Sequence, residues 1–547
     1  MKDTRNFDTL PKEKFALANK GDFISDTVFK DKPIGSFKDA WIRFRRNKAS
    51  IVAAGIILII FLFAFLTPLF TFGYDSTFLD PYYAKMGPRN LTLAKIGIAT
   101  GASDYDGSEK NIVRVYSIGA AALDTGDNKV AIKDTYGNMY QPVREITGTK
   151  TQFNLLTQRD DMFYTAKVDP YLNIGFIYKD IEQAEYYKIL AWQEETGIQV
   201  LYPLIASNKY NPGAPFEHKQ VTNNTTYYAG LTNPNDWYKS SQYTPLKDLG
   251  NGRYSEQNLA NGVDIGDVVF EDNYLRDAEG NLVYFKNSSG GTSETSQFKV
   301  RILYYNYYRY KNGFEPEYIF GTDSQGYDLA LRMADGVRLS LLIAICVSMI
   351  NFVIGASYGA IEGYYGGVVD LTLERVSDIL AGVPFMIVAT LFQLHLAKQV
   401  GAIPSLLFAF VMTGWIGTAS RVRTQFYRFK NQEYVMAART LGARDARIIW
   451  KHIFPNSLGT IITSSVLVIP GVIFSESMLS FLGIVNLGGS KSTSLGTLLS
   501  EASGLWTNYP HLMLFPALII SLLMISFNLF GNGLRDAFNP SLRGVEE

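Results

Sequence analysis

Residues 433–456, EYVMAARTLGARDARIIWKHIFPN, form a basic, helix-prone segment with the composition of a soluble protein. Apolar runs flank it at residues 402–420 and 458–482, and each run is long enough to cross a lipid bilayer. A segment of soluble character held between two membrane spans is placed to contact a partner at the membrane surface. The stretch therefore predicts a polytopic membrane protein with a docking element on one side.

The 547-residue chain has no formal net charge, but its composition is not uniform along its length. Apolar runs occupy residues 51–70 and crowd the region after Leu339, whereas the stretch between them is polar and rich in Tyr, Asn and Gly. The runs predict transmembrane helices at residues 51–72, 339–361, 379–396, 402–420, 458–482 and 512–530. The expected fold class is an all-α polytopic membrane domain of about six transmembrane helices, with a soluble α+β insert between the first two.

These patterns divide the chain into consecutive parts. The spacing of Leu329, Leu331, Met333 and Val337 predicts an amphipathic helix at the outer membrane interface. The expected parts are a cytoplasmic leader (1–50), the first transmembrane helix (51–72), an extracellular α+β insert (73–320), the interfacial helix (321–338), a core of five transmembrane helices (339–534) with the loop 421–456, and a cytoplasmic tail (535–547).

Basic residues set the expected orientation. One cluster of Lys and Arg, residues 38–48, precedes the first span, and a second occupies residues 421–451. Because cytoplasmic loops are enriched in Lys and Arg, we expect both clusters and both termini inside the cell, and the insert outside. Cys346 is the only cysteine, so the insert has no disulfide bond, which favours the cell membrane of a bacterium.

Within the insert, residues 111–118 and 298–310 are predicted strands, and residues 180–195 a helix that ends at Gly197. The most aromatic stretch is YYNYYRY, residues 304–310. We interpret it as a strand with tyrosines at the domain surface. The alternative is an adhesive face for a peptide or a partner protein.

Three motifs carry a resemblance to a known family. The first is GTDSQGYD, residues 321–328, with Gly321, Thr322, Asp323, Gly326 and Asp328; the second is the segment 433–456; the third is ESMLSFLG, residues 476–483. From Gly321 onward the chain resembles the permease subunits of ABC importers for oligopeptides and dipeptides, above all the second permease of the pair. It departs from the family at Tyr327, where Arg is usual, at Met436, where the broader family has Glu, and in the length of the insert.

The resemblance implies that segment 433–456 is a coupling loop, which fits a groove in a partner ATPase and transmits the motion of that ATPase to the spans. The residues expected to serve this coupling are Glu433, Tyr434, Ala437, Ala438, Arg439, Leu441, Gly442, Ala443 and Pro455. Small alanines allow a partner backbone to approach, and glycine allows a turn at positive φ. From the residues alone, an amphipathic loop lying on lipid is an equally good interpretation.

A polar path through the membrane is the second expected site. Glu476 is a carboxylate in an apolar span, where ionisable groups usually face a partner or water. It can line a path for peptide, or equally well make a hydrogen bond that packs helices. The path candidates are Asn351, Thr463, Ser464, Ser465, Ser475 and Glu476, whereas Gly355, Gly359, Gly382 and Gly414 are expected to allow close helix packing.

Catalysis by this chain is not expected, because the sequence contains no GxxxxGK[ST] phosphate loop, no HExxH motif and no Cys/His metal spacing. No cofactor or metal is expected, and ATP and Mg²⁺ are assigned to partner ATPase subunits. The resemblance implies as partners a second homologous permease, two ATPase subunits, a soluble or lipid-anchored extracellular peptide-binding protein, the peptide and membrane lipid. Nucleic acid is not expected, since the basic residues follow the membrane topology.

The expected function is that of a permease subunit of an ATP-driven ABC importer for oligopeptides. Its first alternative is an ABC importer for another small solute, such as a dipeptide or nickel. An ion-coupled secondary transporter is less favoured, because it would need ionisable groups in several spans. A membrane receptor is less favoured as well, because no signalling segment is recognised inside the cell.

Overall fold

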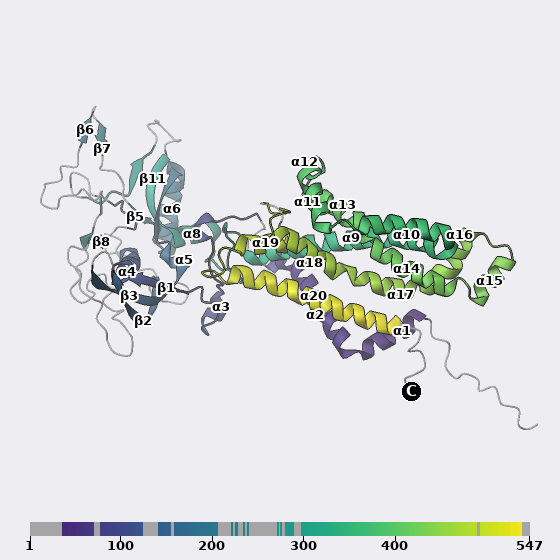
Figure 1. Ribbon diagram of the computed structural model, residues 1–547. Helices are drawn as coiled ribbons and strands as arrows, with labels where there is room; N and C mark the ends of the chain where they lie inside the picture. The colour runs from purple at the N-terminus through teal and green to yellow at the C-terminus, as the bar shows by residue number, and fades with distance from the viewer. Residues whose placement is uncertain are drawn as a thin grey trace, which may run out of the picture.

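A computed structural model describes residues 36–70, 77–123, 140–154, 158–205, 220–222, 225–227, 233–235, 238–239, 271–272, 274–275, 279, 281–288, 297–489 and 493–538. The molecule is elongated, with a helical bundle at one end and a mixed α and β part at the other (Figure 1). The short helices α15 and α16 lie at the end of the bundle far from the mixed part, and α20 ends toward the same side.

Five described helices are long and apolar enough to cross a membrane. A sixth candidate is a bent pair, α10 and α11, whose axes differ by 71°. This confirms the helical, polytopic membrane domain. The bundle helices are α2 (Lys48–Phe70), α9 (Leu329–Tyr365), α10 (Gly367–Ala381), α11 (Phe385–His395), α13 (Ala402–Gly414), α14 (Ile416–Phe429), α17 (Phe454–Val466), α18 (Val468–Phe481) and α20 (His511–Phe538).

The third predicted span, residues 379–396, is not one straight helix. Helix α10 ends at Ala381 and α11 begins at Phe385, after Pro384. Proline disfavours helical geometry in the residue before it, so the chain bends at this point. The stretch between the second and third predicted spans, residues 362–378, is mostly helical as well. Gly366 and Gly367, with φ values of 66° and 55°, turn the chain between α9 and α10.

The separate interfacial helix expected at residues 321–338 is wrong. Helix α9 runs without a break from Leu329 to Tyr365, over 37 residues. The apolar residues that predicted a surface helix are buried: Leu331 packs in the core of the insert, and Met333 and Val337 pack in the core of the bundle. The periodic pattern therefore reflects contacts with protein rather than with the membrane surface.

Close packing of α9 against α14 depends on glycine. A Cβ atom at Gly355 would lie 2.7 Å from the carbonyl oxygen of Trp415, and one at Gly359 would lie 2.1 Å from that of Ala419. These two contacts confirm the packing role expected for Gly355 and Gly359. Gly382 is different, because it ends α10 and its nearest neighbours belong to its own chain segment.

The described part of the insert contains two main antiparallel sheets and several helices, as expected for an α+β domain. One sheet has the order β1 (Ser103–Ser108), β3 (Arg159–Val168), β2 (Val143–Asn154) and is covered by α4 (Glu109–Leu123). The other has the order β10 (Phe285–Asn287), β11 (Gln297–Leu303), β4 (Phe176–Glu182), with β5 (Leu201–Tyr202) also paired to β11. Helices α6 (Gln183–Thr196) and α8 (Tyr304–Asn312) pack beside it.

The remaining described elements are short. They are α1 (Ser36–Arg46), α3 (Leu91–Ala94), α5 (Pro170–Asn173), α12 (Ala397–Val400), α15 (Glu433–Thr440), α16 (Asp445–Arg447), α19 (Leu495–Ala502), a 3₁₀ turn (Pro81–Tyr83), a π-helical turn (Ile448–Ile453) and the strands β6 (Gln220–Thr222), β7 (Thr225–Tyr227), β8 (Tyr238–Lys239) and β9 (Glu271–Asp272).

Two strand predictions in the insert are wrong. Residues 111–118 lie within helix α4, and β11 stops at Leu303, where α8 begins. The tyrosine-rich stretch is therefore a helix, and Tyr304, Tyr305, Tyr307 and Tyr308 are buried in the cores of the insert. Neither a surface strand nor an exposed adhesive face forms, because the rings fill the interior. The helix predicted to end at Gly197 is confirmed as α6, with Gly197 at a φ of 71°.

Candidate functional site

Residues 433–453 fold into two short helices, α15 and α16, and a π-helical turn; α15 and α16 lie at the end of the bundle far from the insert (Figure 1). Helix α15 ends in a turn at Gly442, whose φ is 81°. The backbone N–H of Gly442 donates to the Arg439 carbonyl, and that of Ala443 to the Ala438 carbonyl, each at 3.0 Å. Glycine is suited to this position, because a side chain at positive φ is strained.

This docking element, residues 433–453, is fixed to the bundle. Val435 and Ile448 are fully buried, together with side chains from α9 and α14 such as Val422. The Tyr364 hydroxyl, at the end of α9, donates to the Asp445 carboxylate at 2.5 Å. Apolar burial and this hydrogen bond therefore attach the element to α9 and α14.

The outward face of the docking element carries most of the predicted coupling residues. Leu441, directly before the turn glycine Gly442, is 87% exposed. Ala438 faces inward and is 9% exposed, so Ala437 alone of the two alanines is open to a partner. Ala443 is half-buried, and the exposed coupling residues are Glu433, Tyr434, Ala437, Arg439, Leu441, Gly442 and Pro455.

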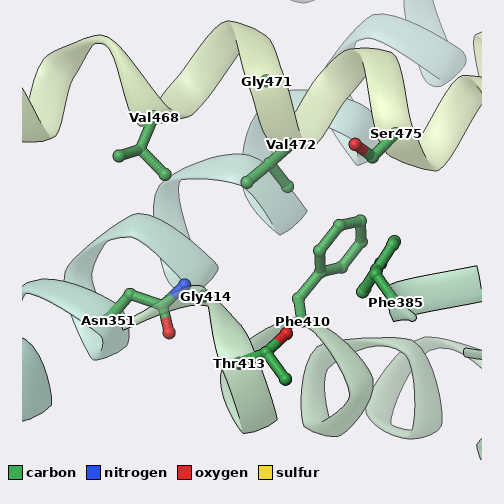
Figure 2. Close-up of a pocket in the computed structure, with 9 residues that line it drawn as sticks. All are labelled: Asn351, Phe385, Phe410, Thr413, Gly414, Val468, Gly471, Val472 and Ser475. Atoms are coloured by element: carbon green, nitrogen blue, oxygen red, sulfur yellow. The ribbon is translucent and has the colours of Figure 1, made fainter. Parts of the chain in front are cut away.

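A pocket of about 310 Å³ lies between α9, α11, α13 and α18 (Figure 2). Its lining has no ionisable side chain. Two aromatic rings, Phe385 and Phe410, stack with their centroids 4.9 Å apart on one side of it. The lining residues are Asn351, Phe385, Phe410, Thr413, Gly414, Val468, Gly471, Val472 and Ser475.

Asn351 is a buried polar residue of the pocket that packs closely against Gly414. It is 1% exposed, and a Cβ atom at Gly414 would lie 2.3 Å from its Nδ2 atom, so Gly414 leaves room for the amide. Its Oδ1 atom has no hydrogen-bond partner within the described residues. An unpaired buried acceptor costs roughly 1–3 kcal/mol, so a ligand that donates a hydrogen bond here would recover free energy.

Two of the six predicted path residues, Asn351 and Ser475, meet at this pocket. The hydroxyls of Thr463, Ser464 and Ser465 instead donate to carbonyls of their own helix, at 2.9, 2.9 and 3.0 Å. The pocket residues Phe385, Phe410 and Thr413 were not predicted from the sequence. The polar residue Thr413 beside Gly414 in an apolar run could have pointed to this site. The sequence gives no sign that α11 and α13 pack against each other here.

Glu476 lies outside the pocket, where α18 meets α9 and α19. It is fully buried, and its carboxylate accepts hydrogen bonds from the hydroxyls of Ser340 and Ser480, each at 3.0 Å. Ser477 adds a longer contact at 3.4 Å. This arrangement favours the helix-packing interpretation of Glu476 over contact with substrate.

We expect Glu476→Gln to leave transport within about two-fold of the unmodified protein, because the amide oxygen still accepts from serine. Glu476→Leu should lower stability by about 1–3 kcal/mol, because it leaves buried hydroxyls without an acceptor. Substrate uptake and thermal unfolding of both variants test this. A loss of uptake in Glu476→Gln at unchanged stability would assign the carboxylate to the path.

The motif GTDSQGYD forms a joint between the insert and the N-terminal end of α9. The Thr322 hydroxyl donates to the Tyr83 carbonyl and accepts from the Met86 N–H at 2.8 Å. A Cβ atom at Gly321 would lie 2.3 Å from the Met86 carbonyl oxygen, and one at Gly326 would lie 2.0 Å from that of Asp80. Both glycines therefore allow the backbone of the motif to contact the backbone of residues 80–86.

The acidic residues of the motif organise the same joint. Asp323 Oδ1 accepts backbone N–H groups of Gln325, Gly326 and Tyr327, each at 2.9 Å. The Oδ2 atom lies 3.5 Å from Nε of buried Arg332, which also donates to the Gly489 carbonyl at 2.8 Å. Asp328 accepts from the Ala330 N–H at 2.7 Å and caps α9. The motif thus holds together the insert, the start of α9 and the loop that contains Gly489.

Asp328, just before the α9 span, should make stability depend on pH. Burial raises the pKa of Asp328 to about 7, and backbone hydrogen bonds from Ala330 and Leu331 oppose the shift. An unfolded aspartate titrates near 3.8. Between these values the folded chain holds a proton that the unfolded chain releases, so the contribution of Asp328 to stability is full below pH 3.8 and is lost as pH rises through about 7.

We expect Asp328→Asn to keep the helix cap, because asparagine also accepts the Ala330 N–H, and to remove this part of the pH dependence. The melting temperature of the variant should exceed that of the unmodified protein at about pH 8 and approach it near pH 4. Asp104→Asn, on the exposed edge of β1, is the control. An equal offset at every pH would contradict the prediction.

The fold and these sites define a subunit of a membrane transporter: a multi-pass helical bundle with a neutral pocket and a pair of short helices fixed at one end. Residues 355–544 match the family described as binding-protein-dependent transport system inner membrane component, and residues 35–88 match the N-terminal TM domain of oligopeptide transport permease C. The chain therefore belongs to the oligopeptide and dipeptide transport permeases of this family.

Individual relatives support the assignment. The oligopeptide transport system permease protein OppC of Bacillus subtilis is 40% identical over 41% of this chain and 72% of its own length. The dipeptide permease DppC of the same organism is 40% identical over 41% and 69%, and OppC of Haemophilus influenzae is 42% identical over 42% and 72%. A solved structure of the MetNI methionine ABC transporter is similar at 16% identity and a TM-score of 0.32, covering 38% of this chain and 96% of the other.

Proposed function

We propose that this chain is one permease subunit of an ATP-driven importer that moves oligopeptides into the cell. The observation that carries the proposal is the continuity of α9, an unbroken helix of 37 residues. Its outer end is capped in the joint by Asp328, its middle places Asn351 in the pocket, and its inner end bonds the docking element through Tyr364. From Asn351 to Tyr364 a helix rises about 20 Å.

One rigid helix can therefore relay motion of the docking element to the pocket. ATP and Mg²⁺ bind two partner ATPase subunits, one of which receives Leu441 and the exposed face of α15. Their closure tilts α9 and α14 together, because both are buried against the element. The pocket then opens alternately to the two sides of the membrane. A second homologous permease supplies the other half of the path, and this chain catalyses no reaction.

The chemistry of the pocket suits peptides of varied sequence. Asn351, Thr413 and Ser475 can hydrogen-bond to backbone amides, which every peptide has. Phe385 and Phe410 offer an apolar surface without charge. Because no lining residue is ionisable, the pocket does not select one sign of side-chain charge.

The proposed location is the cell membrane of a bacterium, with the docking element and both termini inside. Helix α1 supports this arrangement, because Phe44 packs on Phe530 near the C-terminal end of α20, with ring centroids 5.3 Å apart. Figure 1 places α1 and the C-terminal end of α20 toward the same end of the bundle as α15. The insert then stands outside, over the path entrance, where it can receive or orient an extracellular peptide-binding protein.

Reconstitution in liposomes with the partner subunits tests the function. ATP hydrolysis should rise when the binding protein is loaded with oligopeptides, and labelled peptide should accumulate only with ATP. The panel includes dipeptides, because an oligopeptide permease and a dipeptide permease are both 40% identical to this chain. Nickel is added to test the alternative of another small solute. Uptake driven by an ion gradient without ATP, or a chain that purifies without an ATPase, would contradict the proposal.

A further inference from the structure

A short loop at the base of the insert exposes three large aliphatic side chains. Leu93 is 42% exposed, Ile96 69% and Ile98 58%, and we call these three residues the aliphatic tip. Figure 1 shows α3, which contains Leu93, at the junction between the insert and the bundle, projecting sideways beyond the outer end of α20. A cluster of this kind on a fixed loop is unusual on a surface that faces only water.

The loop is ordered by its own hydrogen bonds. The N–H groups of Ile96 and Ile98 donate to the Leu93 carbonyl at 3.0 and 3.1 Å. Asn90 caps α3 through the Leu93 N–H at 2.9 Å, and its own N–H donates to the Ala99 carbonyl at 2.9 Å. The aliphatic tip is therefore presented by a closed, rigid turn.

Contacts to the bundle set the height of the loop. Arg89, at its base, pairs with Tyr318 through backbone hydrogen bonds of 2.8 and 3.0 Å. Two residues further on, the Phe320 ring packs against Phe515 in α20 and Phe63 in α2, with ring centroids 4.7 and 6.2 Å apart. The Gly321 N–H donates to the Tyr318 carbonyl at 3.0 Å and closes a turn. Two residues of chain span at most about 7 Å, so Tyr318 lies within about 7 Å of Phe320, whose ring enters the bundle.

That height corresponds to the lipid headgroup layer, which is about 5–8 Å thick on each side of the hydrocarbon core. Aromatic residues mark the same level: Trp506, 58% exposed, and Tyr509 directly precede α20. Trp and Tyr are enriched at the boundary between lipid and water. Ile319, 48% exposed beside Phe320, continues the apolar surface toward the bundle.

We propose that the aliphatic tip inserts into the outer leaflet of the membrane and anchors the base of the insert there. The occupant of this surface is lipid, because the tip continues the lipid-facing side of the bundle at interfacial height. The anchor resists tilting of the insert relative to α9. The inference needs only that the chain spans the membrane, so it stands or falls independently of the transported substrate.

Fluorescence of a single labelled cysteine tests the anchor in the full-length chain. In a Cys346→Ser background, Ile96→Cys carries an environment-sensitive fluorophore, and the complex is placed in phosphatidylcholine nanodiscs without binding protein. We expect blue-shifted emission and quenching of about two-fold or more by lipids spin-labelled near the headgroup. Tyr187→Cys on α6, an exposed position higher in the insert, is the control and should show neither effect.

Ile98→Cys repeats the measurement at a second position, in case one variant is poorly produced. Blue-shifted emission without lipid quenching would place a protein on the aliphatic tip and overturn the proposal. Emission like that of Tyr187→Cys would show a tip in water and would overturn it as well.

Discussion

Gly442→Asp is expected to reduce transport by at least about 100-fold while the chain stays in the membrane. The turn is exposed, and no atom lies within 4 Å of a Cβ at this position, so the substitution does not disturb packing inside the chain. Strain at a φ of 81° contributes only about 1 kcal/mol. The main effect is a carboxylate beside Leu441, which costs several kcal/mol when a partner covers it unpaired.

Gly442→Asn is the matched control, because asparagine tolerates positive φ and has nearly the same shape without the charge. It should retain a substantial part of the transport that Gly442→Asp loses. Uptake, membrane abundance and co-purification of the ATPase are measured together. Full uptake by Gly442→Asp would refute the docking function of the element, and equal loss in both variants would assign the effect to the backbone.

Gly359→Val is expected to prevent assembly of the bundle. A Cβ atom there would lie 2.1 Å from the Ala419 carbonyl oxygen and 2.9 Å from its carbonyl carbon, both in the backbone of α14. The two helices must separate to admit a side chain, and overpacking of this kind typically costs about 1–3 kcal/mol or more. Because α9 and α14 also hold the docking element, misplacement of one helix should remove transport as well as stability.

Gly417→Ala, in α14, provides the control. No atom lies within 4 Å of a Cβ at that exposed position, and alanine favours a helix over glycine by about 1 kcal/mol. Thermal unfolding of the detergent-solubilised protein should show a clear loss for Gly359→Val and no loss for Gly417→Ala. A normal melting temperature for Gly359→Val would contradict the contact between the two helices.

Patterns that depend on lipid or on local geometry were predictable. Apolar runs predict spans because a segment inside a bilayer must satisfy its backbone hydrogen bonds internally. Five candidate spans overlap predicted ones, and the bent pair overlaps the third predicted span only in part. Gly197 and Gly442 were expected at turns and have positive φ. Asp328 directly precedes α9 and caps it, a role that asparagine, aspartate and serine often have at this position.

Patterns that depend on a distant partner were misjudged. The leucine and methionine spacing after Asp328 predicted a surface helix, since a sequence does not say whether an apolar stripe meets lipid or protein. The tyrosines of α8 predicted a strand by propensity, and tertiary burial overrode that propensity. Polar residues of the predicted path were chosen by type, yet only Asn351 and Ser475 share a pocket.

Repeated membrane crossing, a polar insert and a basic helix pair were predictable from the amino-acid sequence. Those properties follow from composition and short-range spacing, which act on each segment alone. The contact of Glu476 with serines instead of the pocket, the inward turn of Ala438 and the connection of three sites by α9 became evident from the fold. Such facts depend on the rotation of each helix against its neighbours, which is set by side-chain packing between residues far apart in the chain.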